Sequence, residues 1–239
     1  MAVRSRALKC SPSLPPLRRQ FQGPSRSISF VQGDVVHWAG DVLATSTSKN
    51  LEGVKRAHWW GFAGRYSADA ALHLHVGGSL QQECRKHMSE LNFGDVLRTN
   101  PGPQLKVKHL LHTAIPSYPA SLDPASMPLH LASTLAHIMS VDKATSLLRN
   151  SFKQLLETAA NLHAQSLCCP CLGCGIRGWP AHTVAQIGLE ALAEFQSEAV
   201  PHVEFRCIDR HVLGAWIDQA VALGFKENSE PETFCSHLA

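Results

Sequence analysis

Apolar positions along the chain switch between two periods, and this switching predicts strands that alternate with helices. Short apolar or alternating runs at 28–32, 41–45, 94–99, 106–115, 166–169 and 202–208 predict strands. Apolar residues recur at helical spacing from 144 to 163, from 181 to 195 and in a stripe that ends before Gly224. The alternation predicts an α/β fold, a three-layer α/β/α sandwich with a mixed, mostly parallel central sheet.

Polar residues mark where several of these helices are expected to begin. Ser67 is expected to cap the first of them. Ser79 and Gln82 have the spacing of a capping box for the next helix. Asp142 precedes the long helix from about 144 and is expected to cap it.

The segment from 166 to 180 carries the most chemical information. An apolar run gives way to Gly173, Gly175 and Gly178, and a helix follows with Pro180 near its first turn. Glycines permit backbone angles and a close approach that a Cβ would forbid, and a helix N-terminus offers free N–H groups and the positive end of its dipole. The segment therefore predicts a phosphate or diphosphate site.

Length, composition and charge divide the 239 residues into three parts. Residues 1–26 hold six of the 22 basic residues and no acid, so the remainder has 16 basic against 19 acidic residues. We expect 1–26 to be a disordered leader of the transit-peptide type, addressed to a chloroplast or mitochondrion; without an address, the chain would be cytoplasmic or nuclear. A single domain over 27–225 and a polar tail over 226–239 follow, and neither nucleic acid nor membrane is an expected partner.

The glycine run also matches a dinucleotide fingerprint in its letters. A Rossmann domain, however, places this loop after its first strand and an acid about 20 residues later. Here the loop comes late, and Asp209 lies well beyond that spacing. A dinucleotide-dependent oxidoreductase therefore remains an alternative only.

Eight cysteines raise the question of a metal site. Cys168, Cys171 and Cys174 open a ferredoxin-like run, but Gly178 stands where the next ligand would come. Small apolar cysteines that fill a strand end and a tight loop explain the same letters, and reduced thiols are expected. An iron–sulfur or zinc protein is kept as an alternative, and no metal or cofactor is predicted.

One helix face carries an acid and a histidine four residues apart. Asp69, in the first turn, is placed to orient a ribose hydroxyl or a water, while for an arbitrary pair such as Asp69 and His73 a solvated face is the commoner meaning. His109 and His112 lie in an apolar strand and are expected to be satisfied core residues.

Four segments follow one another along the chain: Gly33-Asp34-Val35, Ala68-Asp69-Ala70-Ala71-Leu72-His73, Leu111-His112-Thr113 and Gly173 to Pro180. Together they resemble the macro domain, the ADP-ribose-binding module, over about residues 27–222. The resemblance implies that Asp34, beside Val35, accepts from the adenine amino group and that Asp69 lies near the distal ribose. It also implies that the diphosphate is held by the loop of Gly173, Cys174, Gly175, Ile176, Arg177 and Gly178.

The chain departs from the family pattern at three places. Thr45-Ser46-Thr47-Ser48 stands where many macro domains have Asn-Ala-Ala-Asn, so that Asn50 would have to substitute for a missing amide. A longer segment with Trp59-Trp60 replaces the usual tetraglycine, and Arg177 replaces an aromatic residue.

The resemblance implies a monomeric module that binds ADP-ribose or an ADP-ribosylated protein without a cofactor. If the module is active, Asp69 would be its catalytic residue, and it would hydrolyse ADP-ribosyl esters or related derivatives: carboxyl-linked ADP-ribose, O-acetyl-ADP-ribose or ADP-ribose 1″-phosphate. The alternative is a non-catalytic reader of ADP-ribosylated proteins, which the missing amides favour.

Overall fold

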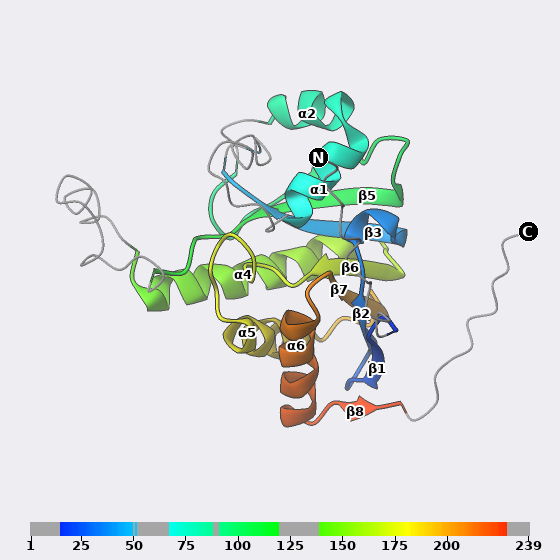
Figure 1. The fold of residues 1–239 in the computed structure, drawn as a ribbon, viewed down its shortest axis with the longest axis vertical. Coiled ribbons are helices and arrows are strands. Elements are labelled where there is room, and N and C mark those ends of the chain that lie inside the picture. Colours follow the sequence, from blue (N-terminus) through cyan, green and yellow to red (C-terminus); the bar gives the residue numbers. More distant parts are fainter. Residues whose placement is uncertain (1–14, 50, 52–66, 88–90, 120–138, 229–239) are drawn as a thin grey trace, which may run out of the picture.

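A computed structural model describes residues 15–49, 51, 67–87, 91–119 and 139–228, and one mixed sheet organises them. The strands are β1 (Arg18–Gln22), β2 (Ser27–Gln32), β3 (Ala39–Thr47), β4 (Val96–Thr99), β5 (Lys106–Ala114), β6 (Ser166–Pro170), β7 (His202–Cys207) and β8 (Lys226–Glu227). Their order across the sheet is β4-β5-β3-β6-β7-β2-β1-β8 (Figure 1). The strands from β5 to β2 run parallel, β4 is antiparallel to β5, and β1 is antiparallel to both β2 and β8, which confirms the predicted α/β class.

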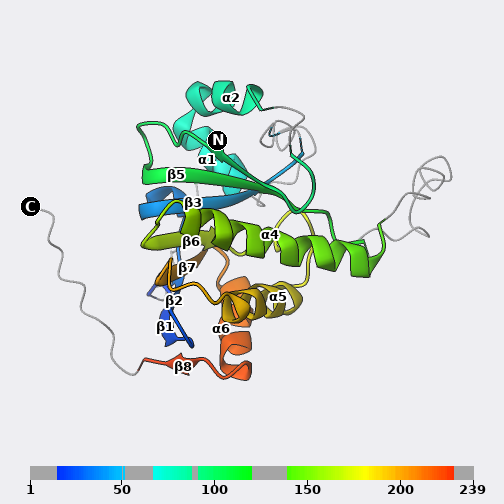
Figure 2. The same cartoon turned by 180° about the vertical axis from the view of Figure 1, so that it is seen from behind.

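Helices cover both faces of the sheet. They are η1 (Val35–His37), α1 (Ala68–Val76), α2 (Gly78–Arg85), α4 (Val141–Asn161), α5 (Ala181–Glu194) and α6 (Arg210–Ala222). Along β3, Val42 and Ala44 pack in the core formed with α4, α5 and α6, whereas Leu43 packs in the core formed with η1, α1 and α2. Figure 2 shows α4, α5 and α6 together, away from α1 and α2. The central strands are therefore buried on both faces, as parallel strands usually are.

The helix that follows Ser67 begins as predicted, but two other predicted caps are wrong. Ser67 accepts a hydrogen bond from the Ala70 N–H at 3.1 Å and caps α1. Gly77, with φ +76°, ends α1 and begins α2 at once, so Ser79 lies inside the first turn and donates to the Val76 carbonyl oxygen. Similarly, α4 is capped by Ser140, and Asp142 is an acid within its first turn.

The predicted boundary between leader and domain at residue 26 is wrong, because the sheet begins earlier. Phe21 in β1 is fully buried, with its ring 5.5 Å from that of Phe30. The buried Arg26 side chain donates to the carbonyl oxygens of Phe195 and Ser197 at 2.7 and 2.8 Å. The prediction followed the basic charge of residues 1–26 and therefore missed a strand that carries a core aromatic residue. At the other end β8 pairs with β1, so the tail predicted from residue 226 starts inside the sheet; residues 1–14 and 229–239 lie outside the described residues.

In the part of the chain that the structure describes, none of the helices has the length and apolar character that crossing a membrane requires.

Candidate ligand-binding site

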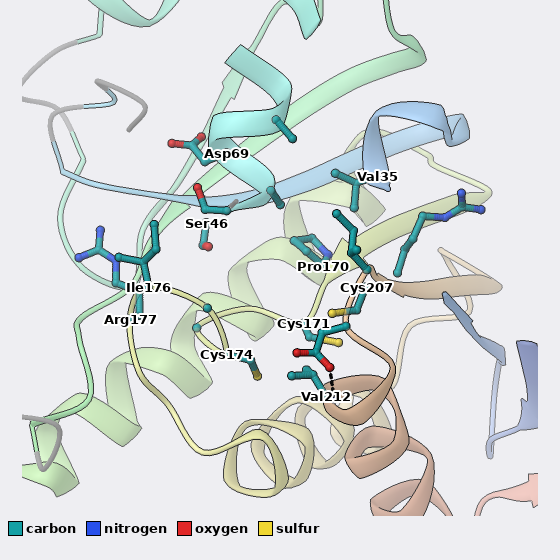
Figure 3. A pocket seen from close by; sticks show the side chains of 18 of the residues that line it. Val35, Ser46, Asp69, Pro170, Cys171, Cys174, Ile176, Arg177, Cys207 and Val212 are labelled. Carbon is teal, nitrogen blue, oxygen red and sulfur yellow. Dashed lines mark hydrogen bonds between the residues drawn. The ribbon is translucent and has the colours of Figure 1, made fainter. Parts of the chain in front are cut away.

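A cavity of about 750 Å³ opens where the parallel strands β2, β3, β6 and β7 end (Figure 3). Carboxyl ends of parallel strands meet at one edge of a sheet, which is where open α/β folds bind their ligands. The wall is lined by segments that follow these strands and by the start of α1: 33–35, 46–48, 67–69, 71, 170–171, 173–177, 206–209 and 212. In Figure 3, Val35, Cys207 and Val212 lie at one end of the cavity and Asp69, Ser46 and Arg177 at the other.

The glycine loop between β6 and α5 is held open by its own contacts. Gly173 has φ +76°, and a Cβ at this position would lie 2.9 Å from the Trp179 ring. That ring is fixed in turn, because its Nε1–H donates to the Pro116 carbonyl oxygen at 2.8 Å. The loop is therefore preformed around a residue that only glycine fits.

Three successive amides of this loop are available to an anion. The N–H groups of Gly175, Ile176 and Arg177 find no acceptor within the described residues, and Gly175 and Ile176 are exposed at the cavity. Successive free amides of this kind form a concavity that attracts phosphate oxygens. The predicted phosphate-binding role is thus geometrically open to these residues, and Gly173 and Cys174 line the same wall.

Two parts of the prediction for this loop are wrong. Gly178 does not line the cavity, since its N–H donates to the Gly175 carbonyl oxygen at 3.0 Å and closes the loop. No residue of α5 lines the cavity either, so the N-terminus of that helix is not part of the site. The helix that begins at the cavity wall is α1, which brings Ser67 and Asp69 to it.

Asp34 and Val35 line the cavity where β2 ends, as the resemblance implies. One carboxylate oxygen of Asp34 accepts from the Val36 N–H at 3.2 Å and caps η1. The Gly33 N–H donates to the Cys207 carbonyl oxygen, which ties this segment to the end of β7. The second Asp34 oxygen accepts no hydrogen bond from the described residues, so it can accept one from a ligand N–H.

Asp69 occupies the other end of the cavity and is 4% exposed, so the alternative of a solvated helix face is wrong. Its Oδ2 accepts from the Thr47 hydroxyl at 3.2 Å, and Arg177 donates to the Thr47 carbonyl oxygen at 3.0 Å. Burial raises the pKa of Asp69 to about 7, against the opposing effects of the Thr47 hydrogen bond and the Arg177 charge. A carboxyl with this pKa can gain or lose a proton near neutral pH.

His73 joins Asp69, and the sequence-based site did not include it. His73 Nε2 lies 3.9 Å from Asp69 Oδ1, too far for a hydrogen bond, and neither atom has another partner among the described residues. Burial lowers the pKa of His73, so the ring is neutral. The sequence shows that His73 lies four residues after Asp69, on the same face of the helix. It does not show that both side chains are buried, because their burial depends on how α1 packs.

The hydroxyl side chains at the end of β3 lie at the same end of the cavity. Ser46, Thr47 and Ser48 line the wall, whereas Thr45 is fully buried. Asn50, the expected substitute for a missing amide, and the Trp59-Trp60 segment lie outside the described residues.

Of the two histidines of β5, one is a core residue as predicted and the other is not. His112 is fully buried, with Nε2 2.8 Å from the Thr99 hydroxyl, and burial lowers its pKa to about 3. His109 is only half-buried, so its prediction as a core residue is wrong.

The cysteines do not converge on a metal. Cys168 packs in the core on the α1 side of the sheet and Cys171 in the core on the α4 side. Among the described residues, no three metal-ligating side chains form a cluster. The C-x2-C-x2-C spacing therefore reflects strand and loop packing here.

Comparison with known proteins agrees with this fold. The sequence model of the macro domain matches residues 61–188, more than half of the chain, and the chain belongs to the macro domain family. A macro domain-containing protein of Streptomyces coelicolor is 23% identical over 194 residues, which cover 79% of this chain and 95% of that protein. An O-acetyl-ADP-ribose deacetylase of Cronobacter turicensis is 24% identical over 77% of this chain and 90% of its own.

Solved structures show the same fold. A variant of the Oceanobacillus iheyensis macrodomain with ADPR superposes with a TM-score of 0.68 at 20% identity. The match covers 87% of this chain and 98% of that one.

Proposed function

We propose that this chain binds ADP-ribose and hydrolyses ADP-ribosyl esters or related derivatives. The observation that carries the proposal is a single cavity with an unpaired carboxylate oxygen at one end, free loop amides along its wall and a buried carboxyl of raised pKa at the other. An O-acetyl-ADP-ribose deacetylase and a macrodomain with ADPR stand among the proteins that resemble this chain.

In the proposed complex, each part of ADP-ribose meets a group of matching chemistry. Asp34 accepts a hydrogen bond from the adenine amino group beside Val35. The amides of residues 175–177 donate to the diphosphate oxygens, and Arg177 adds a positive charge. The distal ribose then reaches the end of the cavity that Asp69 lines.

Hydrolysis of an acetyl ester in this position uses Asp69 as general base. The ionised carboxylate removes a proton from water as the water oxygen attacks the acyl carbon. The bond between that carbon and the ribose oxygen breaks, and the ribose oxygen takes the proton back from Asp69, which leaves ADP-ribose and acetic acid; the acid then loses its proton to solvent and becomes acetate. The neutral His73 ring lies beside the carboxyl without a hydrogen bond to it, and the Arg177 charge favours the ionised form that the reaction needs.

Turnover of O-acetyl-ADP-ribose tests the enzymatic part. The parent chain is expected to release acetate, and Asp69→Asn, which keeps the size of the side chain, is expected to reduce the rate by about 10²–10⁴. A parent rate no greater than that of Asp69→Asn at equal ligand occupancy would show that Asp69 is no catalyst here.

The second candidate is a non-catalytic reader of ADP-ribosylated proteins. It is favoured by Thr45 and Ser48, which stand where many macro domains have the two amides: Thr45 is fully buried, and Ser48 brings only a short hydroxyl side chain to the cavity. ADP-ribose binding by a parent chain that releases no product from several ADP-ribosyl esters would select the reader over the hydrolase.

We further propose that the chain acts as a monomer on ADP-ribose or ADP-ribosylated protein, and that its basic N-terminal residues address it to an organelle. Because β1 belongs to the sheet, a processing site compatible with the fold lies before Arg18. A fluorescent protein fused behind residues 1–17 should enter a mitochondrion or chloroplast, and uniform cytoplasmic fluorescence would refute the address.

A further inference from the structure

Two thiols face one another in the wall of the cavity. Cys207 ends β7, and Cys171 directly follows β6, the neighbouring parallel strand. The last register pair of these strands is Pro170 with Arg206, so the next residue on each side is a cysteine. Neighbouring strands lie about 4.8 Å apart, and disulfides join Cα atoms about 4.4–6.8 Å apart.

The two side chains are already in contact. A side-chain hydrogen bond between the two thiols shifts the pKa of each, and Figure 3 shows the side chains of Cys171 and Cys207 next to one another. Both residues line the cavity wall. Forming a bond between them requires no new approach of the backbone.

Their surroundings give the two thiols different roles. Cys207 is partly exposed, and hydrogen bonds from Cys171 and from the Asp209 backbone lower its pKa, although burial and the Asp209 charge oppose this. Cys171 is 8% exposed, and burial raises its pKa well above the usual range. An accessible thiol with more thiolate character thus lies above a buried one.

Cys174, the third thiol nearby, is otherwise engaged. Its Sγ donates to the Leu172 carbonyl oxygen at 3.6 Å, and burial raises its pKa to about 12. Cys171 is therefore the partner that the geometry favours.

We propose that Cys171 and Cys207 are an oxidisable dithiol, in which Cys207 reacts with a low-molecular-weight disulfide and Cys171 completes an intramolecular disulfide. The Cys207 thiolate attacks one sulfur of the reagent, whose S–S bond breaks and releases one thiolate. The Cys171 thiolate then attacks the Cys207 sulfur and displaces the second thiolate. The protein loses two protons and two electrons, and the reagent takes them up to become two thiols.

A ligand in the cavity should shield this pair, a consequence that rests on the proposed function. Cys207 carries the carbonyl that holds Gly33, the neighbour of Asp34, and lines the same end of the cavity as Val35. ADP-ribose with its adenosine at that end would cover the Cys207 sulfur.

Treatment of the folded chain with bis(2-hydroxyethyl) disulfide, followed by alkylation, trypsin digestion and mass spectrometry, tests the dithiol. Cys207 lies in the tryptic peptide 207–210, and Cys171 lies in 154–177. We expect these two peptides to be joined in the parent chain and in Cys174→Ser. In Cys171→Ser, the link should be replaced by a mixed disulfide retained on Cys207, and Cys84→Ala, a buried cysteine in α2, should leave the link intact.

A Cys207 that remains open to alkylation in the parent chain, or a link that persists in Cys171→Ser, overturns the dithiol. Melting temperatures of the reduced variants confirm that each is folded. Saturating ADP-ribose should slow the oxidation at least about tenfold, and an unchanged rate at occupancy verified by calorimetry overturns the shielding. If reduced protein gives no heat with ADP-ribose, the proposed function fails, while the dithiol is still decided by the peptide map.

Discussion

At the scale of single residues, the site depends on how deeply Asp69 is buried. Its carboxyl is buried at the start of α1, and burial favours the protonated form over the opposing effect of the one hydrogen bond that Oδ2 accepts among the described residues. An ordinary aspartate is ionised well below neutrality, whereas Asp69 titrates at a pH of about 7. Stability and activity should therefore respond to pH in opposite directions through the same group.

Stability should fall as pH rises through the range in which Asp69 ionises. Because the folded pKa of about 7 exceeds the unfolded value, the folded state binds more protons between pH about 4 and pH about 7, and the free energy of unfolding decreases across that window. Asp69→Asn should remove this decline, which is at most about 4 kcal/mol. Chemical denaturation of both proteins at pH 5 and pH 8 measures the decline. An equal change in the free energy of unfolding between these two pH values in both proteins would contradict the burial effect.

His112 acts on stability in the reverse direction. Its folded pKa of about 3 lies below the ordinary value, so the free energy of unfolding falls as pH drops below about 6.5. The contribution is the same in parent and Asp69→Asn, and the difference between the two proteins isolates Asp69.

The activity profile should report the same carboxyl and its neighbour Arg177. The rate of O-acetyl-ADP-ribose hydrolysis should rise with pH around 7 as Asp69 ionises. Because the Arg177 charge lowers the pKa of Asp69, Arg177→Met should move the rising limb to higher pH, whereas Arg177→Lys should leave it closer to its original place. If the rising limb stays at the same pH in Arg177→Met, the Arg177 charge does not influence the pKa of Asp69.

At the scale of elements, the loop between β6 and α5 depends on two glycines in different ways. Gly173 has φ +76° and faces the Trp179 ring, whereas a Cβ on Gly175 would meet nothing within 4 Å. Gly173→Ala should lower the free energy of unfolding by about 1–3 kcal/mol, and Gly175→Ala by less than about 1 kcal/mol. Equal melting temperatures for the two variants would show that the loop is not preformed as described.

Sequence reasoning located elements better than it located their ends. Alternating and helical periods predicted the strands from β2 to β7 and the long helix α4 within a few residues, but not β1 or β8. The caps of α2 and α4 were missed because Gly77 and Ser140 were not distinguished from the polar residues beside them. Such choices depend on backbone angles, which the spacing of side-chain types does not fix.

The site itself was predictable where one segment carried it. The loop residues and Asp34 reach the cavity, but the prediction gave the anion the N-terminus of α5, which lies away from the cavity wall. His73 was missed as part of the site, and the contact of Cys171 with Cys207 joins two strands far apart in sequence. The contact between the two cysteines depends on the order of the strands in the sheet, which periodicity alone does not give.

At the scale of the whole molecule, the sheet recruits both ends of the described chain. The antiparallel ladder of β2, β1 and β8 completes the core beside α6, with Phe21 and Phe225 buried in it. The basic charge of residues 1–26 does not reveal this strand, because Phe21 is the only large apolar residue in the sequence of β1. The domain that binds ligand therefore begins with β1.

Removing the Phe21 ring should destabilise the whole domain. Phe21→Ala should reduce the free energy of unfolding by about 3–5 kcal/mol, because the cavity left beside Phe30 cannot collapse fully. Gln22→Ala, an exposed position in the same strand, should cost less than about 0.5 kcal/mol. Denaturant unfolding measures both effects. Similar midpoints for the two variants would show that β1 does not stabilise the domain and belongs to the leader.

Calorimetric titration of ADP-ribose into the parent chain and into Asp34→Ala tests the central claim most directly. We predict saturable one-site binding by the parent, weaker binding of AMP and of NAD, and an affinity at least about tenfold lower in Asp34→Ala, since one charge-assisted hydrogen bond contributes about 1.5–3 kcal/mol. No heat with ADP-ribose, or tighter binding of NAD than of ADP-ribose, would contradict the account.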